Sequence, residues 1–108
     1  MIRGVQTTVP VDLETLGRVG EALADPVRRS VLARLATGPG YPAELADEFG
    51  VSRSGMSNHL ACLRGCGFVT ATYEGRRVRY TLADPAIADA LGLLSRLPLH
   101  PCPEDGRP

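Results

Sequence analysis

The chain has 108 residues, with 12 arginines and no lysine against 12 acidic residues, and 44% of it is hydrophobic. This length fits one domain of roughly 100–150 residues and excludes the large catalytic folds, while the apolar content and balanced charge argue against disorder. No apolar run of about 18 residues is present, and residues 1–14 contain no apolar signal-peptide core. We therefore expect a cytoplasmic protein with no membrane partner.

Two helices are expected before residue 36. Apolar residues recur at helical spacing from Leu13 to Leu23 and predict the first helix. Asp25-Pro26 then indicates a break and a restart, because Asp is a favourable N-cap and Pro is tolerated at the first helical position. The second helix has an inward apolar stripe that includes Val31 and Leu35, and it ends before residues 38–40.

A helix-turn-helix unit is expected next. It consists of a short helix over residues 42–49, a turn at 50–52 and a longer helix over 53–66. Ser52 is the expected N-cap of the longer helix, whose inward stripe is Met56, Leu60 and Leu63. Gly67 is expected to stop it.

The rest of the chain predicts a β-hairpin and one more helix. Period-two alternation over residues 69–73 and 78–82, with a turn at 74–76, predicts the hairpin. Asp84-Pro85 opens a last helix that runs to Leu97 and is apolar on two sides, so we expect it to pack against its own domain and a second copy. The fold class is therefore mainly α with a β-hairpin, in the order α-α-α-α-β-β-α: a winged helix-turn-helix. The domain would span residues 12–97, between a flexible arm (1–11) and a proline-rich tail (98–108) that carries Cys102.

The helix-turn-helix unit and the hairpin predict binding to double-stranded DNA. The longer helix projects Arg53, Ser54, Ser57 and Asn58 away from its apolar stripe, and such side chains read base edges and hold phosphates. Residues 51–82 contain five arginines against one acidic residue, a net charge of +4 within a neutral chain. The other members of this basic face are Arg64, Arg76, Arg77 and Arg79. The alternative is a small protein-interaction module with solvated arginines.

Several motifs resemble the ArsR/SmtB family of bacterial winged-helix repressors. They are residues 22–29 (ALADPVRR), 57–69 (SNHLACLRGCGFV) and 73–80 (YEGRRVRY), within roughly residues 13–97. The resemblance implies a homodimeric repressor that pairs through its first and last helices and binds a near-palindromic operator. It also implies a DNA-contact or packing role for His59, which belongs to the generic family motif.

The three cysteines are the candidate effector site. Cys62 and Cys66 are four residues apart on the predicted helix, where a metal ion can bridge two thiolates but a disulfide would strain the helix. Cys102 could supply a third thiolate from the same or the partner subunit, and three thiolates suit Cd(II), Pb(II), Zn(II) or Cu(I). Because a cadmium- and lead-sensing member of the family has cysteines at all three positions, the resemblance implies that Cys62, Cys66 and Cys102 are metal ligands.

We therefore expect a metal-responsive repressor and not an enzyme. The metal-free dimer would bind operator DNA, and Cd(II) or Pb(II) would release it. Nickel or zinc as effector, and thiol oxidation or reactive sulfur species acting on the same cysteines, are the alternatives. His59 and His100 are further candidate ligands. No activated nucleophile or carboxylate pair in the sequence points to catalysis.

Overall fold

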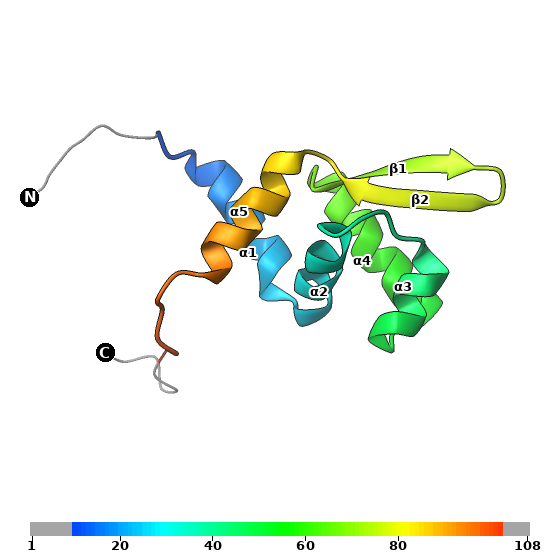
Figure 1. Cartoon of the computed structure of the whole chain (residues 1–108), viewed down its shortest axis with the longest axis horizontal. Coiled ribbons are helices and arrows are strands. Elements are labelled where there is room, and N and C mark those ends of the chain that lie inside the picture. The colour runs from blue at the N-terminus through cyan, green and yellow to red at the C-terminus, as the bar shows by residue number, and fades with distance from the viewer. Residues whose placement is uncertain (1–9, 103–108) are drawn as a thin grey trace, which may run out of the picture.

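A computed structural model of the chain describes residues 10–102 and shows five helices and one hairpin (Figure 1). The elements are α1 (Leu13–Ala24), α2 (Pro26–Leu35), α3 (Pro42–Phe49), α4 (Arg53–Gly65), β1 (Val69–Glu74), β2 (Arg77–Leu82) and α5 (Pro85–Ser95). This order confirms the predicted winged helix-turn-helix fold. Most of the predicted arm and the end of the predicted tail, residues 1–9 and 103–108, lie outside the described residues.

The corner between α1 and α2 is built from one short motif. The Asp25 carboxylate accepts hydrogen bonds from the backbone N–H groups of Val27 (2.8 Å) and Arg28 (3.0 Å), and the Arg28 N–H is the main cause that lowers the pKa of this carboxyl. The Arg28 guanidinium donates a hydrogen bond to the carbonyl of Glu21 (2.6 Å). The Arg29 guanidinium donates one to the carbonyl of Leu23 (2.6 Å). Since helix ends leave carbonyls unsatisfied, these arginines cap α1 from α2 and set the angle between the two helices.

The core lies where α2, α3, α4 and the hairpin meet. Its largest fully buried side chains are Leu32, Leu45, Met56, Leu60, Leu63, Val31 and Val69. All three residues predicted to form the inward stripe of the longer helix are among them, so that prediction is confirmed. Leu32 and Leu45, which the helical stripes had not singled out, join α2 and α3 to this cluster.

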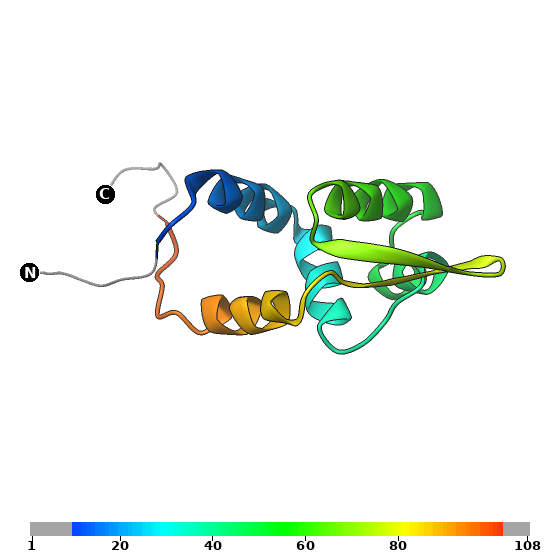
Figure 2. The same cartoon turned by 90° about the horizontal axis from the view of Figure 1, so that it is seen from above.

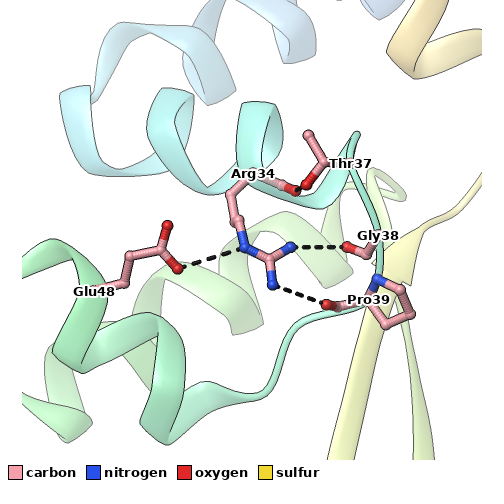
Figure 3. Close-up of polar contacts among 5 residues, drawn as sticks. All are labelled: Arg34, Thr37, Gly38, Pro39 and Glu48. Carbon is pink, nitrogen blue, oxygen red and sulfur yellow. Dashed lines mark hydrogen bonds and ion pairs between the residues drawn. The ribbon is translucent and has the colours of Figure 1, made fainter.

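The loop between α2 and α3 is held by Arg34 (Figure 3). Its guanidinium donates to the carbonyls of Gly38 (3.1 Å) and Pro39 (3.2 Å) and forms an ion pair with Glu48 of α3 (3.4 Å). The Thr37 hydroxyl donates to the Arg34 carbonyl (2.7 Å). One side chain thus connects the end of α2, the loop and the first helix of the helix-turn-helix unit.

The hairpin pairs β1 and β2 antiparallel, from Val69 opposite Leu82 to Glu74 opposite Arg77. The turn is therefore residues 75 and 76, shorter than predicted, and Gly75 has the positive φ (61°) that such a tight turn requires. Two backbone hydrogen bonds between Gly40 and Tyr80, of 2.8 and 2.9 Å, attach the loop before α3 to the wing.

Helices α1 and α5 lie at the end of the molecule opposite the wing tip, and α2 lies between these two helices and the helix-turn-helix unit (Figure 2). Neither helix buries much of its apolar surface within one chain. Leu13 is 77% exposed, Leu93 is 63% exposed, and α5 has no buried residue. Helix α5 ends at Ser95, two residues earlier than predicted, because Pro98 disfavours helical geometry at Leu97. Within residues 10–102, no helix is both long enough and apolar enough to cross a bilayer.

We expect Leu32→Ala to lower the free energy of unfolding by about 2–5 kcal/mol, because it opens a cavity where α2 meets α3 and α4. Urea denaturation followed by circular dichroism measures this change. Asp47→Ala, at an exposed position of α3, is the control and should change stability by less than about 0.5 kcal/mol. Equal effects of the two substitutions would contradict the assigned core.

Candidate nucleic-acid interface and thiol pair

Helix α4 presents a polar face opposite its buried stripe. The Ser52 hydroxyl accepts the N–H of Gly55 (3.0 Å) and starts the helix. Met56, Leu60 and Leu63 are 0% exposed, which fixes the rotation of the helix about its axis. The structure therefore places the predicted base-reading residues Arg53, Ser54, Ser57 and Asn58 together on the exposed face.

The predicted wing arginines differ in their surroundings. Arg76 lies in the turn and is exposed. Arg77 pairs with Glu44 (2.6 Å) and lies over the Tyr41 ring, with its guanidinium carbon 3.6 Å from the ring centroid. Arg79 lies 3.9 Å from a carboxylate oxygen of Glu74. The sequence did not predict the pairing of Arg77 because its acidic and aromatic partners, Glu44 and Tyr41, belong to a different motif over 30 residues earlier.

The two other predicted contact residues of α4 are His59, at the middle of the helix, and Arg64, near its C-terminal end. The pKa of the exposed Arg64 is raised, chiefly by a hydrogen bond with the Tyr73 phenol, so this side chain lies beside the wing. His59 is half-buried and within electrostatic range of Asp25, whose pKa it helps to lower after the larger effect of the Arg28 N–H.

The thiol pair lies at the C-terminal end of α4. Cys62 is exposed, and Cys66 is half-buried at the C-cap, where its N–H donates to the Cys62 carbonyl (3.1 Å). The helix ends there, one residue earlier than predicted, because Gly67 takes φ 86° and Phe68 N–H donates to the Leu63 carbonyl (2.9 Å). This end structure holds Cys66 at the junction between α4 and the wing.

The third cysteine is not brought to the pair within one chain. Cys102 is exposed beyond α5. In the part of the chain from residue 10 to residue 102, no three His, Cys, Asp or Glu side chains lie together as a metal site requires. The structure thus places two thiols at the C-terminal end of α4 and the third away from them.

A hollow that the sequence did not reveal adjoins Cys66. It has a volume of about 340 Å³ and lies between α1, α5 and the turn from α4 to β1. Its apolar lining includes Val19 and Leu23 of α1, Phe68, and Ile87 and Leu91 of α5. The half-buried thiol therefore borders both α4 and the two helices, α1 and α5, whose apolar faces are exposed.

Comparisons with known proteins agree with this geometry. The sequence profile of a helix-turn-helix domain family matches residues 23–71. The chain is 57% identical over 84 residues to the HTH-type transcriptional regulator CmtR of Mycobacterium tuberculosis, a match that covers 78% of this chain and 71% of that protein. The chain belongs to the ArsR/SmtB family of winged helix-turn-helix transcriptional regulators.

Solved structures of ArsR/SmtB-type proteins share the fold. The NMR structure of the cadmium metal-sensor CmtR from M. tuberculosis superimposes with a TM-score of 0.65 at 52% identity and covers 85% of this chain and 94% of that one. The homodimeric winged helix-turn-helix domain of Mb0332 from Mycobacterium bovis, a possible ArsR-family regulator, gives a TM-score of 0.72 at 32% identity over 77% of each chain. Family membership makes this chain a DNA-binding transcription regulator.

Ser57→Ala and Asn58→Ala should relax the base preference of operator binding. Each loses a polar group on the exposed face of α4, and a good side-chain contact to a base edge discriminates by about 1–3 kcal/mol. Competition among duplexes with single base-pair changes measures this preference. Ser30→Ala, at an exposed position of α2, is the matched control. An unchanged preference in both α4 variants would contradict the assignment of the reading face.

Proposed function

We propose that this chain is a metal-responsive repressor that binds a near-palindromic operator as a metal-free homodimer and leaves it when Cd(II) or Pb(II) binds Cys62, Cys66 and Cys102. The observation that carries the proposal is the position of the thiol pair. Cys62 and Cys66 lie at the end of the helix that presents the DNA-reading face, and Cys66 also borders the hollow between α1 and α5.

Dimerisation is supported by the apolar side chains that one chain leaves uncovered. Leu13 and Leu16 on α1 and Leu93, Leu94 and Leu97 on or just after α5 are all at least 45% exposed. Large apolar side chains exposed on two helices are typical of a protein–protein interface. Two copies that pair through α1 and α5 would cover it and would hold two α4 helices at a fixed spacing, as successive major grooves require. Residues 12–97 would then form the DNA-binding and dimerisation domain.

The donor set suits a soft metal ion. Thiolates select soft ions such as Cd(II) and Pb(II) over Mg(II) or Ca(II). Side chains four residues apart on a helix lie on the same face, so the Cys62 and Cys66 thiols can bind one ion. Cys102 follows the end of α5 by seven residues, which span up to roughly 25 Å when extended. Leu94, near the end of α5, lines the same hollow as Cys66, so the tail starts near the thiol pair. The relative CmtR is described as a cadmium metal-sensor, which agrees with this donor chemistry.

The bound ion would supply a link between thiolates that are otherwise separate. Cys66 would then connect the end of α4 to the tail and, through the hollow, to α1 and α5. The effector releases DNA only if the thiols bind it more tightly in the DNA-free arrangement of these helices. A coupling of about 1–3 kcal/mol would weaken operator binding about 5- to 150-fold.

Cys102→Ser tests the switch. Without metal, its operator affinity should equal that of the unmodified protein, because no residue of the reading face changes. With saturating cadmium, two thiolates should still bind, with lower affinity, and operator affinity should fall little. Thiolate-to-metal absorbance and operator binding, measured on the same samples, give both quantities.

Two further variants complete this test. Cys62→Ser should bind cadmium only weakly and should stay on the operator when cadmium is added. The double variant Ser95→Cys/Cys102→Ser keeps three thiols but moves the third one to the end of α5. Full release of Cys102→Ser by cadmium would show that the tail is not part of the switch. Metal binding by the unmodified protein without any release would reject the proposed regulation.

Leu93→Glu combined with Leu97→Glu should give monomers or insoluble protein, because four carboxylates would enter an apolar interface between two copies. Analytical ultracentrifugation measures the oligomeric state. Asp89→Asn, a polar change at an exposed position of α5, is the control and should leave a dimer. A soluble dimer that carries both glutamates would contradict this interface.

A further inference from the structure

The tip of the wing is attached to the start of α3 by four side chains. Tyr41, the residue before α3, donates its hydroxyl to Glu74 at the end of β1 (2.9 Å). Arg77, at the start of β2, stacks on the Tyr41 ring and pairs with Glu44 in the first turn of α3 (2.6 Å). We call these four residues, Tyr41, Glu44, Glu74 and Arg77, the wing latch.

The latch holds the wing at a second point. The base of the hairpin is attached to the loop before α3 by the backbone pair Gly40–Tyr80. An isolated two-stranded hairpin is marginally stable in water, and the outer residues of β1 are exposed. Support near the turn therefore decides how firmly the wing tip is held relative to the face of α4.

The same contacts redistribute the charge of the wing. Glu44 faces Arg77 and Glu74 faces Arg79, so two of the three wing arginines lie beside carboxylates. Arg76 is exposed in the turn, and among the described residues it takes part in no ion pair. The wing therefore presents one uncompensated positive charge, at the turn.

We propose that Arg77 is a positioning residue, which fixes the wing through the latch, and that Arg76 makes the contact of the wing with DNA phosphate. This inference rests on the proposed binding of operator DNA. Stacking on an aromatic ring while pairing with a carboxylate depends on the planar shape of the guanidinium. A contact with a phosphate depends chiefly on its positive charge. Lysine keeps the positive charge but has no planar group. Substitution by lysine should therefore impair a positioning role but not a phosphate contact.

The test uses substitutions that leave the net charge unchanged. Tyr41→Leu and Arg77→Lys should each weaken operator binding by roughly two- to fivefold per wing, the effect of losing an exposed cation–π contact, with an unchanged dependence on salt. The double variant Tyr41→Leu/Arg77→Lys should bind no more weakly than either single variant, because both changes open the same latch. Tyr41→Phe keeps the ring under Arg77 but loses the hydrogen bond to Glu74, so it should weaken operator binding less than Tyr41→Leu does.

Arg76 supplies the matched comparison. Arg76→Lys should bind nearly as tightly as the unmodified protein, because lysine still neutralises a phosphate. Arg76→Ala should reduce the slope of log affinity against log salt by about 0.9 per wing. Unchanged operator binding by Arg77→Lys or by Tyr41→Leu would overturn the proposal. So would a loss of operator affinity in the double variant that equals the product of the losses in the two single variants.

Hydrogen exchange of the free protein separates the latch from DNA binding. Backbone amides of residues 70–81 should exchange several-fold faster in Tyr41→Leu and Arg77→Lys than in the unmodified protein, and at an unchanged rate in Arg76→Lys. If the unmodified protein binds no duplex, the proposed function fails and the assignment of Arg76 fails with it. Exchange that is equally slow in all variants overturns the latch itself.

Discussion

The burial of one stripe of α4 is the constraint on which the rest of this structure depends. Met56, Leu60 and Leu63 are completely buried, so the helix has one permitted rotation about its axis. Because side chains on a helix repeat every 3.6 residues, this rotation sets the directions of all the other residues of α4. It turns Arg53, Ser57 and Asn58 outward and leaves Cys62 exposed at the other end.

The ends of α4 are defined as firmly as its rotation. Ser52 caps its start, and the Gly67 turn with the Phe68–Leu63 hydrogen bond closes its end. A thiol at the C-cap, Cys66, therefore lies at a fixed place between the reading helix and the hollow beside α1 and α5. In the proposed repressor, this position is the physical basis for connecting effector binding with the spacing of two reading helices in a dimer.

The surface charges show how a neutral chain presents a basic face. The arginines between residues 51 and 82 exceed the acidic residues in that segment, yet two of the wing arginines face carboxylates in the folded chain. The electrostatic attraction for DNA is consequently smaller at the wing than the local sequence indicates, and it is concentrated at Arg76 and α4. Counting charges along the chain does not reveal such compensation.

The sequence by itself determined the elements of this protein, and the tertiary structure decided which surfaces those elements share. Helix starts at Asp25-Pro26 and Ser52, the buried stripe of α4 and the hairpin follow from periodicity and capping, which act over a few residues. The predictions were wrong at the ends of α4 and α5 and in the length of the hairpin turn, because a glycine with positive φ, a following proline and the strand register decide these boundaries. The contact of Arg77 with Glu44, the position of Cys66 at a hollow and the separation of Cys102 from the thiol pair could not be predicted. They depend on residues brought together from distant parts of the chain, and no local pattern records those distances.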